Sequence, residues 1–273
     1  MPAALRLGVK EVWQIKEENH RAGTVVHSVG WPLDQMTYGG SFIYHMEPNL
    51  LHIGMVVGLD YSNPYMSPYH ESQRLKQHPR VKALPEGGAC FSYGARCLNE
   101  GGIQAIPKLT FPGGMIAGCS AGFLNVLKIK GSHTAMRTGM LAGETVAQAL
   151  LAAEEDSAPV ELTAYEEAVK GSWVWEELER VRNFKPAWHA GMIPGLAYGS
   201  ASLILAKGKE PWTFKWAKKD HEYTKLAADC KKIEYPKPDG VYSFEILENL
   251  IKSGVNHEHG QPAHLKLSSS EAA

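Results

Sequence analysis

The stretch from Phe111 to Leu150, FPGGMIAGCSAGFLNVLKIKGSHTAMRTGMLAGETVAQAL, has the residue types and spacing of a ligand-binding turn. The apolar residues 115–117 predict a short strand, and the small residues 118–122 predict a turn where backbone can approach a ligand closely. A helical pattern follows from Ser132, a good N-cap residue. The free N–H groups and positive dipole end of such a helix suit an electron-rich ring or a phosphate, although most glycine turns before helices bind nothing.

A second candidate site is the glycine pair Gly39–Gly40 in the sequence YGGSF. Two adjacent glycines let a flat ring lie against bare backbone, whose N–H and C=O groups can bond a ring carbonyl. The alternative is a glycine bulge at the start of a strand, which the residues by themselves favour. A basic run between Arg74 and Lys82 leaves a similar choice open, between a solvated helix face and a docking site for an acidic protein partner.

Charge and cysteine usage exclude several kinds of partner. The chain has 28 Lys and Arg against 29 Asp and Glu, a net charge of −1, so we expect no nucleic-acid partner. The four cysteines are scattered without a CxxC pair, and a metal or cluster site built from them is not expected. The spacing of His257, His259 and His264 could hold a metal, but no carboxylate or thiol spacing supports it, so we predict no metal site there.

Hydrophobic periodicity predicts strands first and helices later in the chain. The β-branched or alternating runs at 10–15, 23–29, 39–46 and 50–59 predict an antiparallel meander. Helices are predicted at 68–78 and 162–182, and a further strand at 90–95. The chain then returns to the glycine turn, which indicates two interleaved domains, each assembled from separate segments.

The segment from Pro186 to Ala206 contains no Asp, Glu, Lys or Arg. Tryptophans and lysines border it, and this pattern is typical of a segment that dips into one membrane leaflet. A glycine-rich helical hairpin buried in a soluble core fits the composition equally well. The segment is too weakly apolar for a spanning helix, which needs about 20 apolar residues. The residues predicted to contact the membrane are Trp188, Met192, Ile193, Leu196, Leu203, Ile204 and Leu205.

Several sequence words resemble one family of flavoproteins and occur in its order. They are YGGSF, GLDYSNPY, LNEGG, PKLTFPGG, GCSAGFLNVLKIKGSHTAM, SWVWEEL, IEYPKPDG and NHEHGQPAHL, and they span nearly the whole chain. They resemble flavoproteins related to geranylgeranyl reductases, and most closely the electron-transfer flavoprotein–ubiquinone oxidoreductases. Cys119 stands where the wider flavoprotein motif has an Asp, and Ala121 and Leu127 replace prolines expected in the family.

The resemblance implies an electron path from reduced electron-transfer flavoprotein through a [4Fe–4S] cluster and FAD to ubiquinone. It implies a ubiquinone site at Gly39 and Gly40 and a location on the matrix side of the mitochondrial inner membrane, or on the cytoplasmic membrane of a bacterium. The implied FAD contacts are Gly118, Cys119, Ser120, Gly131, Ser132, His133 and Thr134. The cofactors carry the chemistry, so no catalytic acid, base or nucleophile is predicted on the chain.

The implied fold is α+β, with an antiparallel-sheet quinone-binding part interleaved with the C-terminal part of a glutathione-reductase-like FAD domain, plus the monotopic membrane segment. The expected divisions are 1–86 for the sheet, 87–155 for the FAD-domain part, 156–220 for the helical and membrane-associated segment, and 221–273 for the start of the iron–sulfur domain. The chain has neither a GxGxxG motif near its N-terminus nor the four-cysteine cluster segment, so we expect a central fragment. A non-catalytic membrane-binding fragment and a geranylgeranyl-reductase-like flavoenzyme remain as alternatives.

Overall fold

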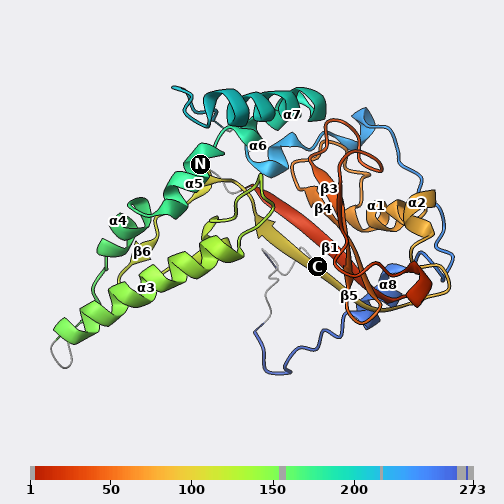
Figure 1. Ribbon diagram of the computed structural model, residues 1–273, viewed down its shortest axis with the longest axis horizontal. Coiled ribbons are helices and arrows are strands. Elements are labelled where there is room, and N and C mark those ends of the chain that lie inside the picture. The colour runs from red at the N-terminus through yellow and green to blue at the C-terminus, as the bar shows by residue number, and fades with distance from the viewer. Residues whose placement is uncertain (1–3, 154–157, 216–217, 263–268, 270–273) are drawn as a thin grey trace.

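The computed structural model describes residues 4–153, 158–215, 218–262 and 269. The described chain forms an antiparallel sheet with helices packed beside it, and an elongated arm of helices that projects from one end of the sheet (Figure 1). Each part has its own hydrophobic core, one around the sheet and one between the arm helices. The fold is therefore a mixture of helices and strands with an antiparallel sheet, as the sequence predicts.

The sheet has the strand order β2-β3-β4-β1-β5, and all its neighbouring strands are antiparallel. The strands are β1 (Leu5–Gln14), β2 (Val25–Ser28), β3 (Gly39–Met46), β4 (Leu50–Gly58) and β5 (Ala89–Asn99). The predicted meander is confirmed for β2, β3 and β4, whereas β1 lies between β4 and β5. Val9 and Trp13 of β1 and Ile43 of β3 are buried in the core, because alternate side chains of a strand point to one face.

The edge strand β5 belongs to this sheet along its whole length. It pairs with β1 from Ala89 opposite Gln14 to Asn99 opposite Leu5. The division expected after residue 86 therefore does not hold for the sheet, which extends to Asn99. The sequence predicted a strand only at 90–95, and the structure extends it at both ends, to Ala89 and Asn99.

Two short helices, α1 (Pro68–Leu75) and α2 (Pro79–Lys82), pack beside the sheet. Ser67 caps α1, because its Oγ accepts a hydrogen bond from the His70 N–H at 3.4 Å. Pro68 lies in the first turn, where its missing N–H costs no helix hydrogen bond. The helix predicted over 68–78 is confirmed and ends at Leu75, before Pro79 begins α2.

The arm contains α3 (Ser132–Ala152), α4 (Ala164–Lys170) and α5 (Trp173–Arg180), with the hairpin β6 (Thr110–Phe111) and β7 (Gly114–Met115) beside them. The helix predicted over 162–182 is two helices, because the chain turns at Gly171 and Ser172. The strand predicted at 115–117 is reduced to β7. The arm core consists of Leu109, Ala121, Phe123, Leu141, Tyr165, Val169, Val174 and Leu178.

The charge-free segment forms α6 (Phe184–Ala187) and α7 (Met192–Ala201), then a turn of π-helix, η5 (Ser202–Ala206). In Figure 1, α7 lies at the outer edge of the molecule. No helix among the described residues is long and apolar enough to cross a membrane. The short 3₁₀ helices are η1 (Glu17–Asn19), η2 (Ile103–Ala105), η3 (Gly118–Ala121), η4 (Trp188–Ala190), η6 (Asp220–Tyr223) and η7 (Ala227–Asp229).

The C-terminal part of the described chain returns to the sheet. It is mostly irregular and carries α8 (Ile246–Lys252), which packs near β5. Phe244 is buried in the sheet core and lies 5.7 Å from the Trp13 ring, centroid to centroid. The backbone N–H of Phe244 also donates to Gln73 Oε1 at 2.9 Å. This segment is thus an integral part of the sheet unit.

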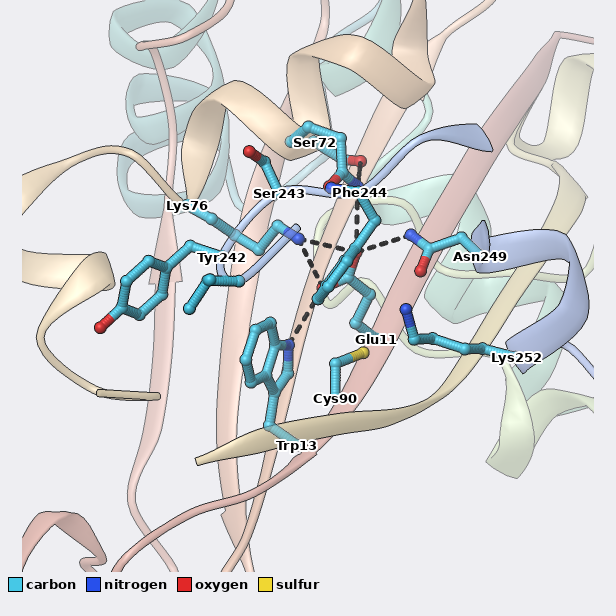
Figure 2. Close-up of polar contacts among 12 residues, drawn as sticks. Glu11, Trp13, Ser72, Lys76, Cys90, Tyr242, Ser243, Phe244, Asn249 and Lys252 are labelled. Atoms are coloured by element: carbon cyan, nitrogen blue, oxygen red, sulfur yellow. Dashed lines mark hydrogen bonds and ion pairs between the residues drawn. The ribbon is translucent and has the colours of Figure 1, made fainter. Parts of the chain in front are cut away.

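One buried carboxylate, that of Glu11, ties these elements together (Figure 2). It is 4% exposed and accepts hydrogen bonds from Trp13 Nε1 at 3.0 Å, Gln73 Nε2 at 2.9 Å and Asn249 Nδ2 at 2.9 Å. Lys76 Nζ lies 2.8 and 2.7 Å from its two oxygens. Burial lowers the pKa of Lys76, and the charge of Glu11 opposes that shift. Glu11 therefore joins β1 to α1 and α8 through charge-assisted hydrogen bonds.

We expect Lys76→Met to lower the free energy of unfolding by about 3–5 kcal/mol, because it leaves the Glu11 carboxylate buried without its counter-charge. Urea denaturation at pH 7 measures this change. Lys16→Met is the control, because the side chains of the Lys16–Glu18 pair are 54% and 74% exposed. It should change the same free energy by less than about 1 kcal/mol. Equal effects of both variants would contradict the role of the buried pair.

Candidate functional site

A pocket of about 470 Å³ lies where the sheet, the loop before α3 and the α6–α7 region meet. The sheet contributes residues of β2, β3, β4 and β5, and the walls are mostly apolar. The loop contributes Val126, Leu127 and Ile129. The α6–α7 region contributes Phe184, Trp188 and Leu196. A concave, largely apolar pocket with a few polar groups has the character of a small-molecule site.

Gly39 and Gly40 begin β3, and both line this pocket. They pair in regular register with Val57 and Val56, so the alternative of a bulge at this position is wrong. A Cβ atom on Gly39 would collide with the carbonyl oxygen of Val56, and one on Gly40 with the carbonyl oxygen of Ser28. The sheet therefore requires glycine at both positions. Because glycine has no side chain, the backbone at these positions is uncovered at the pocket wall.

The predicted glycine turn is the 3₁₀ helix η3, which packs against α3 rather than lining the pocket. Gly118 has a φ of +68°, a conformation that favours glycine, and its N–H donates to Thr138 Oγ1 at 3.1 Å. Cys119 is half-buried and Ser120 is exposed. The turn therefore lies beside the first turns of α3, as predicted.

The N-terminus of α3 is uncapped by side chains. The helix begins at Ser132, and its N-cap is Gly131 rather than Ser132 as predicted. The N–H groups of Ser132, His133 and Thr134 meet no acceptor among the described residues. The Thr134 side chain is already engaged, since its Oγ1 donates to the Phe123 carbonyl at 2.6 Å. The free N–H groups and the helix dipole suit an anionic or electron-rich group.

The loop between this turn and α3 connects the helix N-terminus to the pocket. Asn125 and Lys130 form an isolated antiparallel bridge, with N···O distances of 3.0 and 3.3 Å. Ile129, inside that bridge, has a φ of +55°, which is rare for a β-branched residue. Its side chain lines the pocket. Backbone strain of this kind persists where the surroundings impose it, and it is common at ligand sites.

The sheet wall of the pocket matches a known family. Residues 5–98, which include β1 to β5 up to Leu98, match the family model described as "ETF-QO, ubiquinone-binding". Over the whole of this chain, the mitochondrial electron transfer flavoprotein-ubiquinone oxidoreductase of Dictyostelium discoideum is 50% identical. Over its whole length, the chain is similar to one part of the electron transfer flavoprotein–ubiquinone oxidoreductases.

Two further relatives carry the same name, including the word mitochondrial. The protein of Oryza sativa is 54% identical over 96% of this chain, and that of Homo sapiens is 52% identical over 97%. The chain spans 46% of the Dictyostelium protein and 44% of each of the other two, so it is less than half their length.

The sequence identity to the solved structures is lower than the identity to these relatives. A geranylgeranyl bacteriochlorophyll reductase-like protein of Thermoplasma acidophilum has 14% identity and a TM-score of 0.47, over 92% of this chain and 51% of that chain. The flavin-dependent brominase Bmp2 has 17% identity and a TM-score of 0.48, over 75% and 48%. Likeness at this level does not establish a common fold.

Glu177 of α5 anchors the loop before α3. Its Oε1 accepts a hydrogen bond from Asn125 Nδ2 at 2.8 Å and lies 2.7 Å from His133 Nε2, and its Oε2 accepts from Lys128 Nζ at 2.7 Å. The His133 ring also stacks on Trp173, with centroids 5.8 Å apart. The side chain of His133 therefore holds the loop, and its N–H remains available. Glu177 belongs to the word SWVWEEL, but no local pattern indicated its contact with this loop, because it lies far from the glycine turn along the chain.

A cluster of buried charges lies behind the pocket, where the sheet meets α6. Asp60 Oδ2 lies 2.8 Å from Lys185 Nζ, and Asp60 Oδ1 lies 3.6 Å from Arg6 Nη1. Lys185 Nζ and Arg6 Cζ lie 4.4 and 4.6 Å from the centre of the Tyr38 ring, which is cation–π geometry. Glu100 and Tyr38 line the pocket itself. Sequence analysis missed this cluster, because no local motif joins its members.

The residues predicted to contact a membrane do not all lie on the surface. Trp188 is 4% exposed, lines the pocket, and meets the Tyr38 ring edge-on at 4.9 Å. The structure therefore corrects the prediction for Trp188, which is a pocket residue. Of the other predicted contacts, Ile193, Leu196, Ile204 and Leu205 are exposed, and Met192 and Leu203 are half-buried.

The described residues contain no group of three or more His, Cys, Asp or Glu that could hold a metal ion. Cys90, Cys97, Cys119 and Cys230 are free thiols. His257 and His259 are exposed, and His264 lies outside the described residues. The part of the chain that the structure describes therefore does not fit an iron–sulfur cluster.

We expect Glu177→Gln to lower the free energy of unfolding at pH 7 by about 1–3 kcal/mol, because it removes the charge that Lys128 and His133 bond. Burial by itself would raise the pKa of Glu177, but the hydrogen bonds from Lys128, His133 and Asn125 outweigh it and lower the pKa to about 2. A lowered pKa stabilises the fold above the ordinary value of 4.5, and that stabilisation is lost as the pH falls to about 2.

The difference between wild type and Glu177→Gln should therefore shrink between about pH 4.5 and about pH 2, measured by urea denaturation at several pH values. Glu176→Gln, at the exposed neighbouring position, is the matched control and should change the free energy by less than about 0.5 kcal/mol. A difference that stays constant across this pH range would show that Glu177 does not act through its charge.

Proposed function

We propose that this chain supplies the ubiquinone site and one side of the FAD site of an enzyme that passes electrons from reduced electron-transfer flavoprotein to ubiquinone. The observation that supports it most is the pocket that brings Gly39 and Gly40 together with the loop before α3 and the α6–α7 region. The family model for residues 5–98 names ubiquinone as the ligand. Bound FAD would supply the redox chemistry, and the chain would position both groups.

The pocket has the features that a quinone head group needs. A flat ring can lie against the bare backbone of Gly39 and Gly40, whose polar groups can bond its carbonyl oxygens. Phe42 and Trp188 supply apolar aromatic surface at other walls of the same pocket. Such walls bind the ring and exclude water from its oxygens. The sheet requires glycine at both positions whether or not a quinone binds, so the quinone contacts of Gly39 and Gly40 are a proposal.

The FAD side of the proposal depends on the N-terminus of α3. The N–H groups of Ser132, His133 and Thr134 would bond the electron-rich edge of the isoalloxazine ring. The helix dipole would favour negative charge on the reduced ring at that edge. The backbone of Gly118 and Gly131, with Cys119 and Ser120, would form the rest of this contact.

We propose that the outer surface of α7 and η5 lies in the membrane interface. Ile204 and Leu205 are 72% and 79% exposed, and the exposed Lys207 and Lys209 follow them directly. Apolar side chains beside lysines suit a lipid surface with anionic head groups. Leu196 is exposed and also lines the pocket, so a lipid-soluble quinone could enter without crossing water. Because the relatives are named mitochondrial, we propose the matrix side of the mitochondrial inner membrane.

Electron-transfer flavoprotein is proposed as the electron donor because the relatives carry it in their names. A [4Fe–4S] cluster on the electron path would need ligands from other residues, since the described part of this chain holds no set of them.

The quinone site is tested by filling the pocket. We expect Val29→Trp to weaken the binding of ubiquinone-1 to the chain by at least about tenfold, because Val29 lines the pocket and its side chain is exposed enough to be enlarged. Isothermal titration calorimetry measures the dissociation constant. Val25→Trp, at an equally exposed valine that does not line the pocket, should leave it unchanged. Equal binding by the two variants would place the quinone elsewhere.

Membrane contact is tested by flotation with vesicles of phosphatidylcholine and cardiolipin. We expect the double substitution Ile204→Glu and Leu205→Glu to abolish most of the flotation, because it places two charges on the apolar surface proposed to enter the interface. Leu226→Glu is the matched control, since Leu226 is 75% exposed and lies outside that segment. Flotation of the double variant at the wild-type level would contradict the membrane proposal.

A further inference from the structure

Glu100 places a carboxyl group in the wall of the pocket without a hydrogen bond. Its residue is 3% exposed, and it lines the same pocket as Gly39 and Gly40. Among the described residues, its carboxyl oxygens take part in no hydrogen bond, and its ion pair is with Arg6 Nε at 3.8 Å. That distance is beyond hydrogen-bond range. A buried carboxyl group so placed has one free direction for its proton, which is the pocket.

Arg6, the ion-pair partner of Glu100, also has N–H groups without a hydrogen bond among the described residues. It is 0% exposed, and its Nε and Nη2 donate to no acceptor among the described residues. A small movement of Glu100 toward Arg6 would turn the 3.8 Å pair into a charge-assisted hydrogen bond. The carboxyl group thus has two states available, a neutral acid facing the pocket and an anion held by Arg6.

The surroundings favour the neutral acid when the pocket is at rest. Burial raises the pKa of Glu100, and the Arg6 charge partly opposes this. The charge of Lys185 is already paired with Asp60. Burial also raises the pKa of Tyr38, with Glu100 adding to the effect, so the phenol stays protonated. The titratable groups that face Arg6 from the remaining side are His189 and Asp220.

We infer that Glu100 is a proton donor to a quinone bound in this pocket, an inference that rests on the proposed function. Reduction of a quinone to a quinol takes two electrons, supplied by reduced flavin, and two protons. The O–H bond of Glu100 breaks as an O–H bond forms on one quinone oxygen, and Arg6 stabilises the carboxylate that remains. Bulk water returns a proton to Glu100, and bulk water protonates the second quinone oxygen as the quinol leaves the apolar part of the pocket.

Such a donor matters because the pocket walls are mostly apolar. A quinone oxygen that gains negative charge there has little water to protonate it, and the anion is costly in such surroundings. A positioned general acid typically contributes about 10²–10⁴-fold to a rate. The assignment gives Glu100 a catalytic role that no sequence motif indicated.

The first test reads the protonation of Glu100 in the chain itself. An infrared difference spectrum between the wild-type chain and Glu100→Gln should show the C=O band of a carboxylic acid at about pH 6, well above the ordinary glutamic acid pKa of 4.5. Glu71 and Asp220, whose pKa values burial also raises, are present in both proteins and cancel. Addition of ubiquinone-1 should shift the band. A missing band, or one that bound ubiquinone-1 leaves unchanged, would overturn the inference.

The second test separates proton transfer from electron transfer in the flavin-loaded protein. Glu100→Gln should slow reduction of ubiquinone-1 by about 100-fold and change its solvent isotope effect, with KM nearly unchanged. Reduction of ferricenium, which takes an electron and no proton, should be unaffected. Glu86→Gln, at an exposed glutamate outside the pocket, should match wild type with both acceptors. Equal slowing of both acceptors by Glu100→Gln would show a general effect on the flavin and overturn the inference.

Different results would contradict the proposed function and the role of Glu100. A wild-type chain that does not bind ubiquinone-1 contradicts the proposed function. A wild-type protein that binds and reduces it, together with a Glu100→Gln variant that does so equally fast, contradicts the role of Glu100 alone.

Discussion

The carboxylate of Asp60 holds the sheet and the α6 region together, and the pocket depends on this contact. Asp60 lies between two buried cations, Arg6 of β1 and Lys185 of α6. Both cations also lie against the Tyr38 ring. In a medium of low polarity, ions are tolerated only while their partners stay in place, so this cluster imposes one relative position on its elements. Because Gly39 directly follows Tyr38, the same cluster positions the start of β3 at the pocket wall.

The loop before α3, on the opposite side of the pocket, is held by a second carboxylate, that of Glu177, through hydrogen bonds to side chains of the loop. Glu177 bonds three side chains of the segment 125–133 and keeps Ile129 against the pocket in a conformation that its residue type disfavours. The N-terminus of α3 follows this loop at once, so the proposed flavin contacts and the pocket share one support. The sheet and the arm have separate cores, and the pocket forms where their anchored edges meet.

The glycine pair shows that structural and functional explanations of a residue need not compete. Gly39 and Gly40 are required because neighbouring backbone leaves no room for a Cβ atom. The same absence of side chains exposes polar backbone where a flat ring could bind. A substitution here would disturb the sheet and the proposed site together, so residues such as Val29, which line the pocket without supporting the sheet, separate the two roles better.

The sequence by itself predicted most of the strands and helices, the similarity to the electron transfer flavoprotein–ubiquinone oxidoreductases, and two of the places where a ligand was expected. Alternating and three-to-four-residue patterns are local, and they specify which face of an element is apolar. The charge-free segment and the helix after the glycine turn could be found in the same way, because each is continuous along the chain.

Only the tertiary structure decided what meets at the pocket. It placed β1 between β4 and β5, turned Trp188 inward, and brought Arg6, Asp60, Glu100 and Lys185 together. A charged residue that is buried and paired has the same letter in the sequence as one on the surface. The charged residues of this cluster are separated by tens of residues along the chain. Only the packing of distant elements excludes the water that would otherwise screen their charges and weaken their interactions.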